Sequence, residues 1–253
     1  MANSKIALVT GGSRGLGENM AIRLAEKGLD VIVTYKSNKE EADKTVAEIE
    51  KLDQKAYALQ LDVSKSGKFM AFADEVKKVL DSHFNASKID FLVNNAGIGI
   101  NVPLVETTEE QFDILVDIHF KGTFFLTQKL LPIISDGGGI VNISSGLARF
   151  SFPGYSVYGS LKAAIDTLTR YQAKELASRK IRANVVAPGG VETDFAGGVN
   201  KTDENKRTAI ANITALGRMG KPDDIGGVVA FLCTEDAKWI NGQRIEVSGG
   251  LLL

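Results

Sequence analysis

Short apolar runs alternate with longer amphipathic segments along the whole chain. The short runs are rich in Val and Ile, which favours β-strands, and the segments between them carry apolar residues at a helical period. The predicted strands are Ile6–Thr10, Val31–Tyr35, Ala56–Leu61, Phe91–Val93, Ile140–Ile143, Ala183–Val186 and Arg244–Val247. The predicted helices are Gly15–Lys27, Lys39–Leu52, Lys68–His83, Glu109–Leu131, Val157–Ser178 and Pro222–Cys233.

The predicted strands are continuously apolar, which is typical of parallel strands that helices cover on both faces. Each intervening helix is long enough for a right-handed crossover. We therefore expect an α/β fold, a doubly wound, Rossmann-like parallel sheet of about seven strands with helices on both faces.

No repeat, low-complexity tract or linker divides the 253 residues. We therefore expect residues 1–253 to form a single domain that combines the cofactor and substrate sites. Residues 192–219 are polar and glycine-bearing, with a short helical segment at 203–212. This stretch is predicted to be a substrate lid, and a passive surface loop is the alternative.

The charge balance narrows the class of partner. The 30 Lys and Arg residues nearly cancel the 31 Asp and Glu residues, so the basic excess of a nucleic-acid-binding protein is absent. No apolar stretch reaches the roughly 20 residues of a membrane span, and the N-terminus does not resemble a signal peptide. The single cysteine, Cys233, suits a reducing compartment. We expect a cytoplasmic protein with no nucleic-acid, membrane or metal partner.

A glycine-rich turn follows the first predicted strand and opens the first predicted helix. Glycines allow a tight turn and close backbone approach, while the helix N-terminus attracts the pyrophosphate of a dinucleotide. The residues predicted to bind the cofactor here are Gly11, Ser13, Arg14, Gly15, Leu16 and Gly17.

The end of the second predicted strand bears on the choice of cofactor. An NAD-preferring site usually has Asp or Glu there, to bind the ribose 2′-hydroxyl. This chain instead has Tyr35 and Lys36, and Arg14 is expected to reach the same corner. Two cations favour a 2′-phosphate, so NADP(H) is the predicted cofactor, with NAD(H) as the alternative.

Three polar residues form a candidate catalytic set. Ser145 follows the fifth predicted strand, and Tyr158 and Lys162 stand four positions apart on the next helix. Residues at this spacing share a helix face, so the ammonium is expected to lower the pKa of the tyrosine and let it act as an acid. The Ser145 hydroxyl is placed to polarise a carbonyl. Apolar residues near these motifs form the predicted substrate pocket: Ile98, Leu147, Phe150, Phe152, Tyr155 and Phe195.

These motifs, in this order, resemble the classical short-chain dehydrogenase/reductase family over essentially the full chain. The resemblance also rests on Asp62 and Val63, on Asn94 to Gly97, and on Pro188 and Gly189 with Thr193. It implies that Asp62 and Val63 contact adenine, that Asn94 supports the sheet and that Asn95, Ala96 and Gly97 border the cofactor. It further implies that Lys162 binds the nicotinamide ribose, that Pro188 and Gly189 line the site, and that Val191 and Thr193 bind the carboxamide.

One position departs from the family pattern, because His119 stands where the family usually has Asn. In the family this position helps to hold a water that links Lys162 to solvent, largely through its backbone carbonyl. We expect the relay to tolerate the change. The alternatives are a damaged relay and a histidine that donates protons itself.

The motifs and the resemblance together predict an NADPH-dependent oxidoreductase that transfers hydride between nicotinamide and a carbonyl or alcohol carbon, with Tyr158 as acid or base. A small free ketone, polyol or sugar-like alcohol is the first predicted substrate class. A ketoacyl thioester of acyl carrier protein is the second, with Arg179 as a candidate docking residue. A non-catalytic NADP(H)-binding sensor or scaffold is the remaining alternative. The resemblance also implies a homotetramer, built through the two long helices and the C-terminal leucines.

Overall fold

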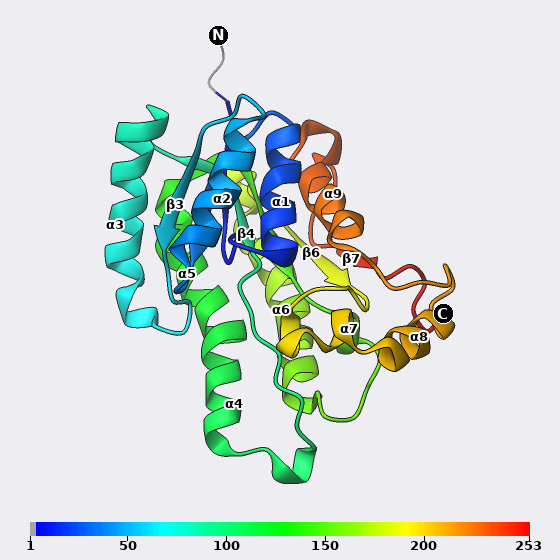
Figure 1. Cartoon of the computed structure of the whole chain (residues 1–253). Helices are drawn as coiled ribbons and strands as arrows, with labels where there is room; N and C mark the ends of the chain where they lie inside the picture. Colours follow the sequence, from blue (N-terminus) through cyan, green and yellow to red (C-terminus); the bar gives the residue numbers. More distant parts are fainter. Residues whose placement is uncertain (1–3) are drawn as a thin grey trace.

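The computed structural model describes residues 4–253, and within them seven strands form one parallel sheet (Figure 1). The strands are β1 (Ile6–Val9), β2 (Asp30–Tyr35), β3 (Ala56–Gln60), β4 (Ile89–Asn94), β5 (Ile134–Ile143), β6 (Arg182–Pro188) and β7 (Arg244–Val247). Their order across the sheet is β3-β2-β1-β4-β5-β6-β7. The predicted fold class is confirmed.

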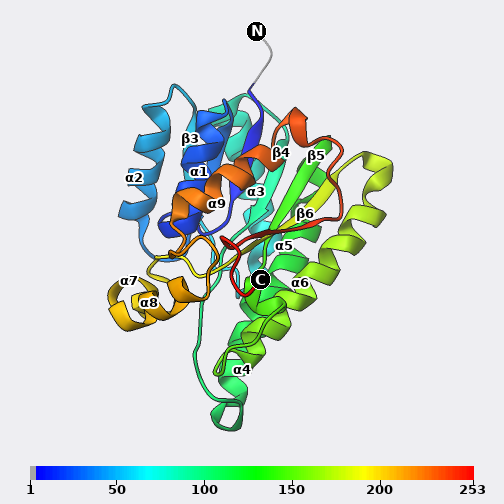
Figure 2. The ribbon, with the colours of Figure 1, turned by 90° about the vertical axis from the view of Figure 1, so that its right-hand side faces the viewer.

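Helices cover both faces of this sheet (Figures 1 and 2). One face packs against α1 (Gly15–Glu26), α2 (Lys39–Glu50) and α9 (Pro222–Leu232). The other packs against α3 (Phe69–Val79), α5 (Thr123–Leu130) and α6 (Ser156–Glu175). Three further helices, α4 (Glu109–Val116), α7 (Val199–Thr202) and α8 (Glu204–Asn212), lie near the edge where the strands end (Figure 2).

Strand β1 shows why the strands are continuously apolar. Ala7 and Val9 belong to the core under α1, α2 and α9, whereas Ile6 and Leu8 belong to the core on the opposite face. All four residues are buried. Successive side chains point to opposite faces, so a strand covered on both faces needs an apolar residue at every position.

Most elements differ from their predicted bounds by a few residues, and two differ more. Strand β5 begins at Ile134 rather than at Ile140, and it crosses a run of glycines that resembles a loop in the sequence. A Cβ at Gly138 would lie 2.2 Å from the carbonyl oxygen of Asp90, so close strand approach requires glycine there. The predicted helix 109–131 is interrupted between α4 and α5 by one π-helical stretch, Asp117–Gly122.

The order of the strands indicates where a ligand binds. The chain runs outward from β1 to β2 and β3 on one side, and from β4 to β7 on the other. Ligands bind doubly wound sheets where the order reverses, outside the carboxyl ends of the strands. Asn94 at the end of β4 donates to Asn142 Oδ1 (2.8 Å) and to Thr127 Oγ1 (3.0 Å), which ties the sheet together at this point.

Among residues 4–253, no helix has the length and apolar character needed to cross a bilayer.

Candidate active site

A cleft of about 790 Å³ opens at the carboxyl ends of the strands. It joins the glycine turn to Ser145, Tyr158 and Lys162, which the sequence places far apart. All but one of the predicted site residues line it: Gly11, Ser13, Arg14, Gly15, Leu16, Gly17, Lys36, Asp62, Val63, Asn95, Ala96, Gly97, Ile98, His119, Ser145, Leu147, Phe150, Phe152, Tyr155, Tyr158, Lys162, Pro188, Gly189, Val191, Thr193 and Phe195. One continuous space can therefore hold a dinucleotide and a second small molecule.

Residues 11–17, which we call the glycine turn, form a cradle that only glycines allow. Gly11 and Gly15 have φ angles of 66° and 59°, in the left-handed region. A Cβ on Gly17 would lie 2.1 Å from the Gly11 carbonyl oxygen. Asn95 Nδ2 holds the turn from β4 by donating to the carbonyl oxygens of Thr10 (2.9 Å) and Gly11 (3.2 Å).

The turn also fits the charge of a pyrophosphate. The N-cap residue of α1 is Arg14, and its side chain makes no capping hydrogen bond. The N–H groups at the start of a helix are free to bind an anion, and the helix dipole favours negative charge there. The residues present therefore fit the phosphates of a dinucleotide.

The predicted 2′-phosphate corner contains two cations. Arg14 is exposed and lines the cleft, and no ion pair joins it to another described residue. Lys36 also lines the cleft, with its Nζ 3.2 Å from Asp62 Oδ2. The prediction that Tyr35 binds the cofactor is wrong. Its side chain is buried in the core with α1 and α2 and does not line the cleft. As the last residue of β2, it faces the core while Lys36 leaves the sheet.

Tyr158 and Lys162 come from the first turns of α6, and Ser145 stands just beyond β5. Lys162 Nζ donates to the carbonyl oxygen of Ile143 (2.7 Å) and lies 5.5 Å from the centre of the Tyr158 ring. The Ser145 hydroxyl oxygen accepts from the N–H of Leu147 (3.2 Å). Ser145 thereby caps the short 3₁₀ turn Gly146–Ala148. The i, i+4 spacing therefore brings the tyrosine and lysine together on one face, as predicted.

Burial controls the protonation of this group. It raises the pKa of Tyr158 above its ordinary value of 10.0, although a hydrogen bond with Ser145 opposes the change. It lowers the pKa of Lys162 to about 8, and the charge of Asp166 opposes that change. The net pKa of Tyr158 is therefore not lowered in this structure, because desolvation of the phenolate outweighs the hydrogen bond with Ser145. The stabilisation of the tyrosinate by Lys162 stays a prediction. Tyr158 is held as the neutral phenol.

His119 lies in the π-helical stretch, with its ring 5.1 Å from that of Tyr158. Its Nε2 lies 2.7 Å from the carbonyl oxygen of Ile98, and its buried Nδ1 has no hydrogen-bond partner among the described residues. Burial and the nearby Lys162 lower the pKa of His119 to about 3. The imidazole is therefore neutral at physiological pH, which argues against a histidine that donates protons.

His119 also explains a neighbouring glycine. A Cβ on Gly97 would lie 2.7 Å from His119 Cε1. The ring therefore occupies the space that any other residue at position 97 would need. It closes the cleft wall between β4 and the π-helical stretch.

Aromatic side chains line the other end of the cleft. The rings of Phe150 and Phe152 are 5.6 Å apart, and Phe195 lies 5.6 Å from Tyr158. The predicted pocket residues therefore share the cleft with the candidate acid, and Phe195 lies beside its ring.

Sequence reasoning missed several lining residues. Leu251 comes from the C-terminal segment, and Ile210 and Lys206 come from α8. No local motif marks any of the three, and only the placement of α8 and of the C-terminal segment brings them to the cleft.

Arg179, the candidate docking residue, makes contacts within the chain. Its guanidinium bonds to Asp136 Oδ1 (2.8 Å) and to the carbonyl oxygens of Leu131 (2.9 Å) and Ile134. It lies at the start of β5, at the opposite end of the strand from the cleft. These contacts and this position do not favour the predicted role of Arg179 in docking a carrier protein, which stays a prediction.

Three comparisons place the chain among known proteins. Residues 11–252 match the family model described as "Enoyl-(Acyl carrier protein) reductase". The chain is 38% identical to a short-chain dehydrogenase/reductase of Pestalotiopsis microspora, covering 98% of this chain and 95% of that protein. It is 39% identical to the 3-oxoacyl-[acyl-carrier-protein] reductase of Staphylococcus aureus over all of both chains. The solved angucycline C-6 ketoreductase LanV with bound NADP is 35% identical, with a TM-score of 0.93 over 98% of this chain and 95% of LanV.

Proposed function

The chain belongs to the short-chain dehydrogenase/reductase family, and from this premise we propose that it is an NADPH-dependent carbonyl reductase. The predicted family and the predicted class of NAD(P)-dependent oxidoreductase are confirmed. The proposal of a ketone reductase rests on one observation above all. A single cleft brings the glycine turn and its two cations together with Ser145, Tyr158 and Lys162.

Tyr158 is the proposed general acid. When bound, the nicotinamide supplies the hydride that forms the new C–H bond. The neutral phenol of Tyr158 gives its proton to the carbonyl oxygen, and the Ser145 hydroxyl donates a hydrogen bond to the same oxygen. The ammonium of Lys162, 5.5 Å from the phenol ring, then stabilises the tyrosinate.

We propose that His119 preserves the active site rather than disabling it. The imidazole is neutral, binds Ile98 and leaves the contacts of Tyr158 and Lys162 in place. This favours catalysis over a non-catalytic sensor or scaffold. Its unpartnered Nδ1 offers an acceptor for a water molecule beside Lys162.

Arg14 and Lys36 support a preference for NADPH over NADH. A 2′-phosphate carries about −1.5 to −2 charges at neutral pH and forms charge-assisted hydrogen bonds with such groups. LanV, which shares the fold at a TM-score of 0.93, binds NADP. The remaining cofactor roles proposed from the family resemblance, including those of Val191 and Thr193, fit their place along the cleft.

The aromatic wall supports an apolar ketone as substrate. Phe150, Phe152, Tyr155 and Phe195 line the same cleft as Tyr158 and offer no charge to an anionic substrate. We therefore favour an apolar ketone over a sugar-like alcohol. Segment 192–219 is proposed as the lid, because Ile210 and Lys206 of α8 reach the cleft from it.

A ketoacyl thioester is the second candidate substrate. The full-length similarity to a 3-oxoacyl-[acyl-carrier-protein] reductase favours it. The involvement of Arg179 in buried main-chain contacts weakens it, because that arginine is the docking residue proposed from the sequence.

We also propose a homotetramer. Four large aromatic side chains, Phe112, Phe124, Phe125 and Tyr171, are exposed on α4, α5 and α6. An exposed apolar patch of this kind marks an interaction site. Light scattering on the purified protein would test the assembly. A cytoplasmic location stays a prediction.

NADPH oxidation at the nicotinamide absorbance band tests the proposed reaction. The assay compares an aryl ketone such as α-tetralone, cyclohexanone and acetoacetyl-coenzyme A, each with NADPH and with NADH. We expect the aryl ketone to be reduced fastest, with NADPH. Faster reduction of the thioester would establish the second candidate. Tight NADPH binding without turnover of any of them would contradict a reductase and support the sensor.

A further inference from the structure

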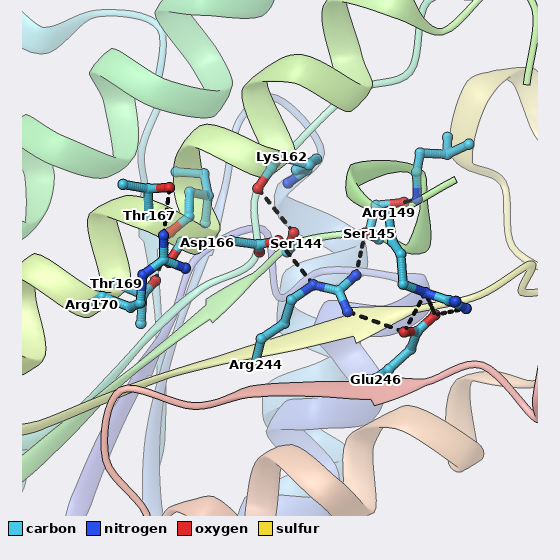
Figure 3. A network of polar contacts seen from close by, with 12 residues as sticks. Ser144, Ser145, Arg149, Lys162, Asp166, Thr167, Thr169, Arg170, Arg244 and Glu246 are labelled. Carbon is cyan, nitrogen blue, oxygen red and sulfur yellow. Dashed lines mark hydrogen bonds and ion pairs between the residues drawn. The ribbon is translucent and has the colours of Figure 1, made fainter. Parts of the chain in front are cut away.

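A cluster of four charged side chains lies beside Ser145 (Figure 3). Its members are Arg149, Asp166, Arg244 and Glu246. At its centre is Arg244 on β7, which the proposed mechanism does not use. Arg244 Nε binds Asp166 Oδ2 (2.9 Å), Nη1 binds Glu246 Oε2 (3.1 Å), and Nη2 donates to the Ser145 carbonyl oxygen (3.1 Å). One guanidinium therefore joins α6, β7 and the residue that polarises the substrate.

The cluster continues from Glu246 to Arg149. Glu246 accepts from Arg149 Nη2 (3.0 Å), and Arg149 Nη2 also donates to the carbonyl oxygen of Leu251 (3.0 Å). The Arg149 guanidinium lies 5.6 Å from the centre of the Phe150 ring. Leu251 and Phe150 both line the cleft, so the cluster contacts two parts of its wall besides Ser145.

Three members of the cluster are more buried than an ordinary surface ion pair, whereas the Arg149 side chain is 42% exposed. The Asp166 side chain is only 12% exposed, and those of Arg244 and Glu246 are each 23% exposed. Asp166 Oδ1 is buried with no hydrogen-bond partner among the described residues. Partly buried charges of this kind are costly to separate from their partners, so the geometry is held firmly.

The contacts converge on the backbone that carries the Ser145 hydroxyl. Lys162 Nζ holds the carbonyl oxygen of Ile143 (2.7 Å), and the Ser144 hydroxyl donates to the carbonyl oxygen of Lys162 (3.1 Å). Arg244 supplies the third contact, on the Ser145 carbonyl oxygen. The same oxygen also accepts from the N–H of Ala148 (3.1 Å) within the 3₁₀ turn, so Arg244 is the contact that joins this turn to β7.

We propose that Arg244 is a positioning residue for the reduction, which orients the Ser145 hydroxyl by holding the Ser145 carbonyl oxygen from β7. Asp166 and Glu246 in turn hold the guanidinium. The inference rests on the proposed function, because it assigns Arg244 to the same reaction. It predicts an effect on the chemical step rather than on binding.

The chain supplies a matched control at the other end of β5. Arg179 binds one carboxylate and two main-chain carbonyl oxygens, including that of Ile134 at the start of the strand. Its side chain is 30% exposed, close to the 23% of Arg244. The two arginines make similar contacts, but only Arg244 touches the cleft residue Ser145.

The experiment compares Arg179→Met, Arg244→Lys and the double variant Asp166→Asn/Arg244→Met, which leaves no unpaired carboxylate at position 166. Values of kcat and KM for NADPH and for the best ketone are measured beside Tm. We expect the double variant to lose about 10- to 100-fold in kcat, because small displacements of catalytic groups have large effects on rate. Its KM values should change less than about threefold, and Arg244→Lys should recover part of kcat. Arg179→Met should lower Tm and leave kcat unchanged.

Equal kcat in the double variant and in Arg179→Met would overturn the proposal, as would a rise in KM at unchanged kcat. If the double variant does not fold, a kcat of Arg244→Lys equal to that of the wild type overturns it and a reduced kcat supports it. The wild-type protein distinguishes a failure of the proposed function from a failure of the role of Arg244. If the wild type reduces no ketone, the proposed function is contradicted, whatever the variants show.

Discussion

The glycine turn, residues 11–17, and the catalytic loop, residues 143–150, line the same cleft but keep their shapes by different means. The turn depends on missing side chains: Gly11 and Gly15 adopt positive φ angles, and Gly17 leaves no room for a Cβ. The catalytic loop depends on side chains from elsewhere, because Lys162 of α6 and Arg244 of β7 hold the carbonyl oxygens of Ile143 and Ser145.

This difference separates binding from chemistry. The turn takes its shape from its own glycines and from Asn95, which follows β4, so its geometry does not depend on α6 or β7. A loop held by distant side chains takes its geometry only when α6 and β7 are packed against β5. We therefore expect substitutions in the two regions to produce separable defects, one in affinity and one in rate.

The largest expected effect is on the chemical side. Tyr158→Phe removes the proton donor and is expected to lower kcat by about 10²- to 10⁴-fold, the usual range for general acid catalysis. Calorimetric titration should show nearly unchanged NADPH binding. Tyr171→Phe removes a hydroxyl from an exposed tyrosine on the same helix and serves as the control. A kcat for Tyr158→Phe close to that of the control would contradict the assignment of the acid.

The next effect is on the binding side. Gly17→Ala places a Cβ 2.1 Å from the Gly11 carbonyl oxygen, so the turn must move. We expect a loss of about 1–3 kcal/mol in stability, as for overpacked sites, together with weaker NADPH binding. Thermal denaturation with and without NADPH measures both.

Gly227→Ala in α9 is the matched control, because it too is a helical glycine and a Cβ there meets nothing within 4 Å. It should stabilise the protein by about 0.5–1 kcal/mol, since alanine loses less backbone entropy in a helix. Equal effects of the two substitutions would show that packing at Gly17 is not the cause.

A smaller effect tests the cofactor corner. Arg14→Ala/Lys36→Ala removes both cations from the predicted 2′-phosphate site. Hydrogen bonds to charged groups contribute about 1.5–3 kcal/mol, so the preference for NADPH over NADH should fall about 10- to 100-fold. The ratio of kcat/KM for the two cofactors measures it. Lys39→Ala removes an exposed lysine paired with Asp43 on α2 and should leave the ratio unchanged.

The smallest expected effect is on the pH dependence of kcat. The pKa of His119 is lowered to about 3, so its protonation does not change between pH 5 and 7 and ketone reduction should show no limb there. The pKa of Lys162 is lowered to about 8, so kcat should fall as pH rises through that value and the ammonium is lost. The pH profiles of the wild type and of His119→Asn measure both. A limb near pH 6.5 that disappears in His119→Asn would make His119 a proton donor.

Local patterns in the sequence predict most of the fold and the residues of both regions. Continuous apolar runs mark the buried parallel strands, and the spacing of Tyr158 and Lys162 places both on one helix face. Strand β5 is predicted too short because glycine disfavours strands, whereas here close approach to Asp90 requires it.

The features of the site that the sequence does not predict have a shared cause. The pKa of Tyr158 depends on how deeply the completed fold buries it, and the contacts of Arg179 depend on which carbonyl groups lie beside it. Leu251 and Arg244 reach the site from the C-terminal part of the chain through tertiary packing. Distances of this kind leave no local pattern to detect.

The order of the sheet also governs how the chain must fold. The contact of Ile6 with Asp90 at the centre of the sheet joins residues separated by 84 positions. Non-local pairing of this kind slows folding, because the loop must close before the contact contributes. During synthesis, β1 therefore exposes an unpaired edge until the ribosome has released β4. Strands β1, β2 and β3 can therefore pair before β4 joins them at the centre of the sheet. A chain that stops before Asn94, the end of β4, would present an aggregation-prone strand edge.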